Sequence, residues 1–390
     1  MRRTGKDHMG GMRRAFCVDT SRRRETLGGR IMRTFAAHLL STLTAVAALT
    51  AAPAASAAPW TFAIFCDGRT AIGEAGGKDG VNVTAVSAIA ADVASQKVSL
   101  VVFPGDLVNG GAEYGPFAQQ LETWKHAMAP LYQAGIPVYV CRGNHELKQD
   151  RPKGNSAAVF RSAFPELPRN GPAGQEGLTY EVDHENAAFI AIDQFAGISP
   201  TFDKKTYDST TNYGMVSPWV IERVRASHAR WVFAFGHESA FIGHHADCLA
   251  SAPAERDALW DALGARGGVY ISGHDHMYVR HTAPDIAHHP VLELVVGCAG
   301  ATPYPYDNAA MNAKLDRLAV PVDEFVNAKA GGVPNTNRLP MYFGYVLITV
   351  DGDELHGAWR AFTNYDTTTF TGPKPPEEPR FETLDRFSWH

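Results

Sequence analysis

The chain has few cysteines, and none of them is spaced as a zinc–thiolate site requires. Five occur in 390 residues, and Cys17 lies in the basic N-terminal stretch. Cys66 and Cys141 end apolar runs, so we predict that both are buried. Cys248 and Cys298 lie in segments that could meet, and an exported protein could join them in a disulfide. A structural zinc site built from thiolates is therefore excluded.

Positive charge is also scarce once the first 57 residues are set aside. Those residues hold 10 of the 36 lysines and arginines and 3 of the 41 acidic residues. The remainder has 26 basic and 38 acidic residues, a net charge of −12. That balance argues against a nucleic-acid surface. The hydrophobic content of 45% suffices for one large core, and we find no internal repeat and no sign of a second domain.

The chain lacks an apolar run long enough to span a membrane, which takes about 20 residues. Residues 32–57 instead combine a basic start, a short apolar segment at 39–50 and the small residues Ala55-Ser56-Ala57. This pattern is typical of a signal peptide. We predict a protein exported to the periplasm or outside the cell, without a stable membrane anchor, whose mature chain starts near Ala58. We interpret residues 1–31 as a non-native or unstructured extension.

Five short apolar runs, each typical of a buried strand, end in polar residues. The runs are 62–66, 100–105, 136–141, 231–236 and 269–273. They are followed in turn by Asp67, Asp106, Gly143-Asn144-His145-Glu146, His237 and His274-Asp275-His276. In α/β folds, ligands bind at the carboxyl ends of such strands. We therefore expect these polar tips to form one site.

Helical patterns between the runs predict the connections. Helices are expected over 82–96 and 116–134, and this alternation with strands predicts parallel strands joined by right-handed crossovers. We place the domain at 58–365, with 300–340 as a candidate lid because loops of that length are often binding loops. The final residues, 366–390, contain several prolines and are expected to be an extended tail.

The donor set at the five tips is typical of a pair of metal ions. Carboxylate, amide and imidazole donors without thiolates suit Zn, Mn or Fe, as divalent or trivalent ions. Two such ions about 3.5–4 Å apart clamp a phosphoryl group and lower the pKa of a bridging water. A carboxylate between the ions is needed because the two cations repel each other.

The order of these motifs resembles the calcineurin-like metallophosphoesterase superfamily over about residues 60–362. The resemblance implies a four-layer α/β/β/α sandwich with mixed sheets and a site at the C-terminal ends of the strands. It implies Asp106 as the carboxylate that bridges both metals. The other implied ligands are Asn144, His237 and His274 for one metal and Asp67 and His276 for the other. It also implies attack by a metal-bridging hydroxide, with His145 as the general acid, oriented by Glu146 or another acid.

The first motif departs from the family pattern, which is Asp-x-His where this chain has Asp67-Gly68-Arg69. Arginine stays protonated and cannot bind a metal. Either the first metal has fewer protein ligands, or another side chain, with Asn109 as one candidate, replaces the histidine. We expect Arg69 to clamp the phosphate of the substrate. The alternative is that Arg69 pairs with an acid and only holds its loop.

The sequence thus predicts an exported metal-dependent hydrolase of small phosphomonoesters or phosphodiesters. Arg69 and His145 are expected to contact the substrate, and His244 and His245 are further candidates. The alternative is a non-catalytic or weakly active phosphate- or nucleotide-binding protein on a degenerate phosphoesterase frame. No protein partner is predicted.

Overall fold

The computed structural model of the chain describes residues 58–70, 77–150, 155–195, 216–241, 245, 249, 252–282, 289–303, 342–365 and 378–390. These belong to a unit that spans Ala55–His390. The predicted signal peptide, the extension before it, His244, Cys248 and nearly all of the proposed lid lie outside the described residues.

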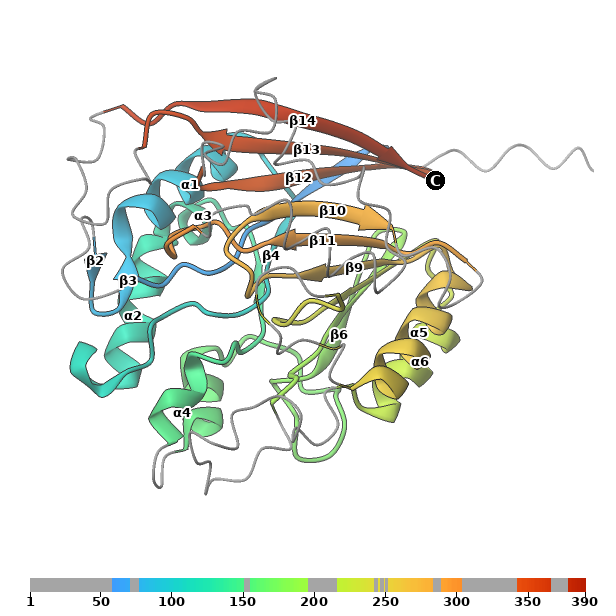
Figure 1. Cartoon of the computed structure of the whole chain (residues 1–390), viewed down its shortest axis with the longest axis horizontal. Coiled ribbons are helices and arrows are strands. Elements are labelled where there is room, and N and C mark those ends of the chain that lie inside the picture. Colours follow the sequence, from blue (N-terminus) through green and yellow to red (C-terminus); the bar gives the residue numbers. More distant parts are fainter. Residues whose placement is uncertain are drawn as a thin grey trace, which may run out of the picture. The chain divides into compact units, whose positions relative to one another are not determined.

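A six-stranded mixed sheet contains the strands from both ends of the domain (Figure 1). Its order is β14-β13-β12-β1-β4-β5, in which β1, β4 and β5 are parallel and the other three pair antiparallel. The strands are β1 Trp60–Ile64, β4 Leu100–Phe103, β5 Val138–Val140, β12 Gly344–Asp351, β13 Glu354–Phe362 and β14 Phe381–Trp389.

A second six-stranded sheet contains the strands from the middle of the chain. Its order is β10-β11-β9-β8-β7-β6, with β7, β8, β9 and β11 parallel and β6 and β10 antiparallel. The strands are β6 Tyr180–His184, β7 Ala187–Ala191, β8 Trp231–Phe235, β9 Val269–Ser272, β10 Tyr278–Thr282 and β11 Leu292–Val296. A separate small ribbon pairs β2 Gly77–Lys78 with β3 Val81–Asn82.

The described part of the chain contains the two predicted helices, the second of them broken in two, and three further α-helices. They are α1 Val83–Ser95, α2 Phe117–Ala127, α3 Ala129–Gln133, α4 Ser156–Ala163, α5 Pro218–Ala226 and α6 Pro253–Gly264, with short 3-10 helices at Ala112–Tyr114 and Glu146–Asp150. The single helix expected over 116–134 is divided at Met128, because Pro130 has no N–H for a bond to the preceding turn. None of the described helices is both long and apolar enough to cross a membrane.

Alternate residues of β8 belong to two different cores. Phe233 packs between the sheets, and its ring lies 4.9 Å from those of Phe62 on β1 and Phe189 on β7. Val232 and Ala234 point to the opposite face, where α5 and α6 cover the second sheet. Residues of α1 and α2 join the core that includes the first sheet. The layers are therefore helix, sheet, sheet and helix, as predicted.

The C-terminal segment is not a separate tail, contrary to our prediction for 366–390. Residues 381–389 form β14, which pairs antiparallel with β13 at the edge of the first sheet. Asp385 accepts hydrogen bonds from the Tyr278 hydroxyl at 2.8 Å and from Arg280 Nε at 2.9 Å, both on β10. This edge strand was missed because prolines precede it and its burial does not alternate cleanly.

The disulfide that could have joined Cys248 to Cys298 is not formed at Cys298. Its thiol is free and buried, and it donates to the carbonyl of Gly344 at 3.7 Å. Cys66 and Cys141 are also free and buried, as expected.

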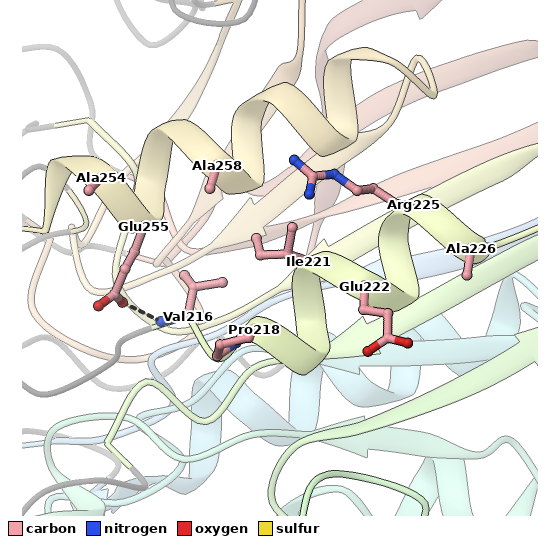
Figure 2. A pocket seen from close by; sticks show the side chains of 9 residues that line it. All are labelled: Val216, Pro218, Ile221, Glu222, Arg225, Ala226, Ala254, Glu255 and Ala258. Atoms are coloured by element: carbon pink, nitrogen blue, oxygen red, sulfur yellow. Dashed lines mark hydrogen bonds between the residues drawn. The ribbon is translucent and has the colours of Figure 1, made fainter. Parts of the chain in front are cut away.

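A cavity of about 650 Å³ lies between α5 and α6 (Figure 2). Its walls are mostly apolar and include Val216, Ile221 and Ala258. The Glu255 carboxylate in its wall accepts a hydrogen bond from the backbone N–H of Val216 at 2.8 Å. None of the polar strand tips lines this cavity. It lacks the convergent polar groups of a reactive site, so the chemistry is sought at the strand tips.

Candidate metal centre

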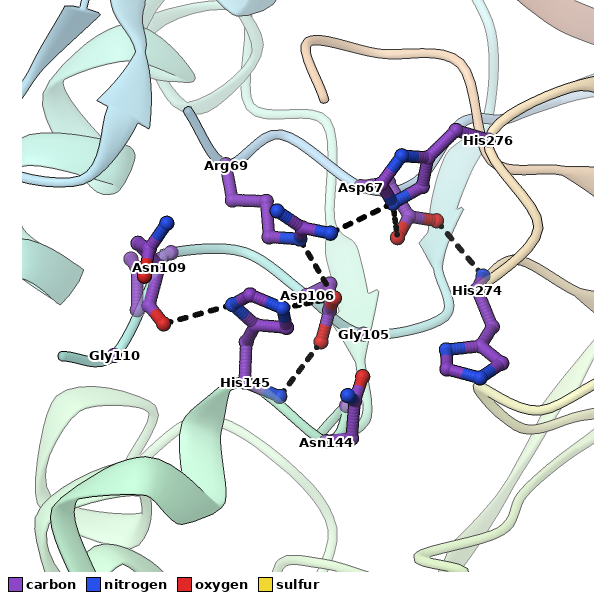
Figure 3. A network of polar contacts seen from close by, with 12 residues as sticks. Asp67, Arg69, Gly105, Asp106, Asn109, Gly110, Asn144, His145, His274 and His276 are labelled. Atoms are coloured by element: carbon purple, nitrogen blue, oxygen red, sulfur yellow. Dashed lines mark hydrogen bonds and ion pairs between the residues drawn. The ribbon is translucent and has the colours of Figure 1, made fainter. Parts of the chain in front are cut away.

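The polar tips of five strands meet although they come from both sheets. The first sheet contributes the residues after β1, β4 and β5, and the second contributes those after β8 and β9. Figure 3 shows most of these side chains gathered around Asp106. The residues brought together and buried are Asp67, Asp106, Asn144, His145, His237, His274 and His276.

One ligand group lies on one side of Asp106. His237 Nε2 is 3.0 Å from Asn144 Oδ1 and 3.3 Å from Asp106 Oδ1. The ring of His274 lies 5.0 Å from that of His237. Atoms bound to one metal ion at 2.0–2.2 Å lie about 2.9–3.5 Å from each other, so this spacing fits a common ion.

A second ligand group lies on the other side and consists of Asp67, Asp106 and His276. Their ligand atoms lie within 4.8 Å of one another, and His276 Nε2 is 3.5 Å from Asp67 Oδ1. Asp67 Oδ1 is buried and has no hydrogen-bond partner. A buried carboxylate oxygen without a partner is costly, and a cation at this position would satisfy it.

Two of the histidines are oriented as metal ligands should be. His237 Nδ1 lies 2.9 Å from the carbonyl of Pro104, and His276 Nδ1 lies 2.7 Å from the carbonyl of Thr302. A carbonyl only accepts, so Nδ1 carries the proton in both rings, and Nε2 presents its lone pair to the site. Such outer contacts are typical of metal-binding histidines. The residues therefore fit a pair of metal ions.

Arg69 lies among the ligands of the second group. Its Nε donates to Asp106 Oδ2 at 3.1 Å, and a terminal nitrogen lies 3.0 Å from His276 Nε2 (Figure 3). This is the alternative that we considered from the sequence, in which Arg69 pairs with an acid. The guanidinium supplies positive charge beside the Asp106 carboxylate.

Asn109 is turned away from the metal ligands. Its side-chain nitrogen donates to the carbonyl of Thr70 at 2.8 Å, and its side-chain oxygen accepts from Lys148 at 3.2 Å. Asn109 therefore does not take the place of the missing histidine in this structure, because both ends of its amide are engaged elsewhere.

Glu146 does not orient His145. Its carboxylate accepts hydrogen bonds from the backbone N–H groups of Asp106, Gly143 and Val108 at 3.0, 2.6 and 3.2 Å. It thereby ties the loop after β4 to the loop after β5. Burial, with Asp106 nearby, raises the pKa of Glu146 to about 7. His145 Nδ1 instead lies 2.8 Å from both Lys148 Nζ and the backbone carbonyl of Asn109. The sequence reasoning missed Lys148, although its position three residues after His145 in a helical turn was an available signal.

The backbone is strained at three of the tips. Asp67, Asp106 and His274 have φ values of 61°, 51° and 66°, in the left-handed region that non-glycine residues rarely adopt. Such conformations cost about 1–3 kcal/mol each and occur mainly where function requires them. Gly143 is needed for close packing, since a Cβ there would lie 2.2 Å from Asp106 Oδ1.

The site keeps its carboxylates ionised in spite of burial. Burial alone would raise the pKa of Asp106, but His145, His237 and Arg69 outweigh it and hold that pKa well below its usual range. The pKa of Asp67 is also lowered, because His276 and His237 outweigh its burial. Both carboxylates are therefore available as anionic ligands at neutral pH.

His245, a candidate substrate contact, is held by Asp275. Its backbone N–H and its Nδ1 both lie 2.9 Å from Asp275 Oδ1, and its ring stacks on His274 at 4.0 Å. It is placed beside the ligand groups, with the ring of His276 at 6.5 Å. Cys66 was not predicted as part of the site, yet its thiol donates to Asp67 Oδ2 at 2.8 Å.

Comparison with known proteins agrees with this arrangement. The family model for calcineurin-like phosphoesterases matches residues 80–278, just over half of the chain. The chain belongs to the calcineurin-like phosphoesterase family. As members of this family typically bind divalent metal ions, the two ligand groups are candidate metal sites of a phosphoesterase.

Two solved structures of low sequence identity share this fold. PhoD has a TM-score of 0.54 and 15% identity, over 86% of this chain and 70% of PhoD. The purple acid phosphatase PPD1 from seeds of yellow lupin (Lupinus luteus) has a TM-score of 0.50 and 16% identity, over 85% of this chain and 53% of that one. Among curated proteins, none matches the sequence. At these identities, the likeness shows that this phosphoesterase shares their fold.

Proposed function

We propose that this phosphoesterase hydrolyses small phosphoric monoesters or diesters at a pair of metal ions. The observation that supports this most is the position of Asp106 between two ligand groups. Its Oδ1 lies 3.3 Å from His237 Nε2, which in turn lies 3.0 Å from Asn144 Oδ1. Its Oδ2 lies 3.1 Å from Arg69 Nε, and Arg69 also lies beside His276. A carboxylate that presents one oxygen to each group is suited to bridge two cations.

Two metal ions bound there would supply Lewis-acid polarisation of the phosphoryl group and a more acidic water. Asp67, Asp106 and His276 would hold one ion, and Asp106, Asn144, His237 and His274 the other. The chain's own residues orient these ligands and exclude water, since every one of them is buried.

The position of His145 supports a role as the acid that protonates the leaving oxygen. Its backbone N–H donates to Asp106 Oδ1 at 2.9 Å, and its Nε2 lies 3.8 Å from Asp106 Oδ2. The imidazole therefore faces the centre of the site. Since a general acid must lie beside the bond that breaks, this position supports His145 in that role.

The proposal is tested with para-nitrophenyl phosphate and bis-para-nitrophenyl phosphate in the presence of Mn²⁺, Zn²⁺ or Fe. We expect turnover of at least one substrate, and a loss of about 100-fold or more in Asp106→Asn, whose amide cannot bridge two cations as an anion. Asp183→Asn, an exposed position on β6, is the control and should keep full activity. A folded, metal-loaded protein that turns over neither substrate contradicts the proposal.

The position of Arg69 favours a second candidate, a phosphate-binding protein with reduced metal content. Its guanidinium pairs with Asp106 and lies beside His276, two of the proposed ligands. A cation already in place lowers the demand for a metal ion there. Elemental analysis separates the two candidates, because fewer than two metal ions per chain together with phosphate binding and no turnover would support the second.

We also propose that the protein is exported. The support is the leader pattern of residues 32–57, which lies outside the described residues. Expression in a secreting host should give a mature protein whose N-terminus, determined by mass spectrometry, starts near Ala58. An intact N-terminus after export would contradict the cleavage site.

A further inference from the structure

The chain after β7 also lies at the edge where the ligands gather, because β7 and β8 are parallel. Three residues there, Asp193, Gln194 and Phe195, are called the β7 tip. None of them is a proposed metal ligand, yet all three are buried, with no more than 2% of each exposed. Because buried polar side chains are nearly always hydrogen-bonded, their partners indicate what this segment does.

Asp193 pairs with a residue of the first sheet, Arg142. Arg142 Nε and one terminal nitrogen lie 2.9 and 2.7 Å from Asp193 Oδ2, and the other terminal nitrogen donates to Ser156 Oγ at 2.9 Å. Both members of the ion pair are buried. Arg142 comes directly before Gly143 and Asn144 in the chain. The ion pair therefore fixes the start of the loop that carries Asn144.

Gln194 holds the residues on both sides of His237. Its side-chain oxygen accepts from the backbone N–H of Glu238 at 2.6 Å, and its side-chain nitrogen donates to the carbonyl of Glu238 at 3.1 Å. A Cβ at Gly236 would lie 3.0 Å from Gln194 Cδ, so the amide also packs against that glycine. The ring of Phe195 lies 6.4 Å from the ring of His237. The β7 tip thus fixes the loop that carries His237 as well.

We propose that the β7 tip consists of positioning residues that set Asn144 and His237 relative to each other. This inference rests on the proposed function, in which these two side chains hold one metal ion. They come from different sheets, and Asn144 Oδ1 lies 3.0 Å from His237 Nε2. Metal ligands must be held within about 0.5 Å of the productive geometry. One short segment bonded to both loops provides that precision.

The effect should be selective for one of the two ligand groups. In the other group, Asp67 Oδ2 accepts from the thiol of Cys66, and His276 Nδ1 lies against the carbonyl of Thr302. These contacts do not involve the β7 tip. Loss of its hydrogen bonds should therefore weaken the ion at Asn144 and spare the ion at Asp67.

The test measures Mn²⁺ binding to the full chain and does not depend on turnover. Free Mn²⁺ gives a sharp EPR signal that is lost on binding, so a titration of chelator-treated protein gives the Kd of each ion. The background His276→Ala leaves the ion at His237, and the background His237→Ala leaves the other. Gln194→Met keeps the side-chain length but removes both hydrogen bonds. It should weaken the ion in His276→Ala by about 10–100-fold and leave the ion in His237→Ala unchanged.

A double variant, Arg142→Met with Asp193→Leu, tests the contact to the first sheet. Both charges are removed together, because a single change would leave a buried charge without its partner and destabilise the fold. The double variant should weaken the same ion. The matched control is Glu181→Leu with Arg223→Met, which removes an ion pair between β6 and α5. It should leave both ions unchanged.

The outcomes separate this inference from the proposed function. A merely structural role would lower the thermal stability of the metal-free protein without any difference between the two backgrounds. Equal weakening in both backgrounds, no change in either, or weakening by the control pair would overturn the role of the β7 tip and leave the proposed hydrolase in place. A wild-type chain that binds no metal ion would contradict the proposed function, and the inference with it.

Discussion

Arg69 adds a fixed positive charge to the site, at the position where the sequence resemblance implies a histidine. It donates to Asp106 and lies beside His276, and its side chain is only 17% exposed. The cation compensates part of the negative charge of Asp106, and it lies beside His276, a proposed metal ligand. Substitution of Arg69 alone therefore separates the effect of its charge from the effect of a bound metal ion.

We predict that Arg69→His raises the metal content of the purified protein relative to Arg69→Ala. Both substitutions remove the guanidinium, but only histidine adds a nitrogen that can bind a metal. Elemental analysis after dialysis against Mn²⁺ or Zn²⁺ measures the difference, and the turnover of para-nitrophenyl phosphate shows whether the added ligand is productive. Identical metal contents in the two variants would show that position 69 has no access to a metal.

Asp275 should make part of the stability depend on acid pH. Burial would raise its pKa, but the hydrogen bond and charge of His245 lower the pKa from 3.8 to about 2. The folded state thus binds this proton more weakly than the unfolded state does. The stabilisation is present above pH 3.8 and is lost as the pH falls through about 2, and it amounts to about 2 kcal/mol. Urea unfolding of Asp275→Asn should lack this loss; a curve parallel to the wild type would contradict it.

β14 links the two sheets mainly through hydrogen bonds to the carboxylate of Asp385. It pairs with β13 in the first sheet, while Asp385 accepts from Tyr278 and Arg280 on β10 of the second sheet. The indole of Trp389 adds a hydrogen bond to the carbonyl of Gly267 at 3.2 Å. Because β10 and β14 lie far apart in the sequence, these bonds close the sandwich at the edge opposite to β5.

We predict that Asp385→Ala lowers the free energy of unfolding by about 1–3 kcal/mol, because it leaves the buried hydroxyl of Tyr278 without its acceptor. Tyr278→Phe in the same background should recover part of that loss. Chemical denaturation of the single and double variants measures both effects. Metal content should not change, since β14 is not part of the ligand groups. A double variant that is merely the sum of the two singles would exclude a direct interaction.

Much of the element order followed from patterns along the chain. The strands at 62–66, 100–105, 136–141, 231–236 and 269–273 were predicted because each is a short apolar run bounded by turn residues. The break at Met128 was not predicted, because the helical periodicity over 116–134 was given more weight than the single proline inside it. β14 could not be predicted because an edge strand has only one neighbour and its residues need not alternate in burial.

At the scale of the whole molecule, the candidate metal centre lies where the two sheets meet. Asp67, Asp106 and Asn144 follow strands of the first sheet, and His237, His274 and His276 follow strands of the second. Ions bound between them would therefore hold the sheets together as well as bind the substrate. Metal binding to the folded state alone must stabilise it by mass action.

We predict that removal of metal lowers the thermal stability of the whole domain. At a free metal concentration of about 100 times Kd, one bound ion adds about 2.7 kcal/mol to the free energy of unfolding. Calorimetry of chelator-treated protein, with Mn²⁺ or Zn²⁺ added back, measures the shift in Tm. His237→Ala should abolish most of it, whereas His184→Ala on β6, which is not a proposed ligand, should leave it unchanged. No shift in the wild type would contradict a metal centre between the sheets.

The types of residue at each strand tip, and the parallel order of the strands that carry them, were determined by the sequence alone. Both follow from local rules: apolar runs form strands, and crossovers place their carboxyl ends along one edge. Only the tertiary structure decided that Arg69 pairs with Asp106, that Glu146 binds backbone N–H groups, that Lys148 contacts His145 and that β14 joins the sheet. A hydrogen bond depends on distances of a few tenths of an ångström between separate loops, and no periodicity along one segment contains that distance.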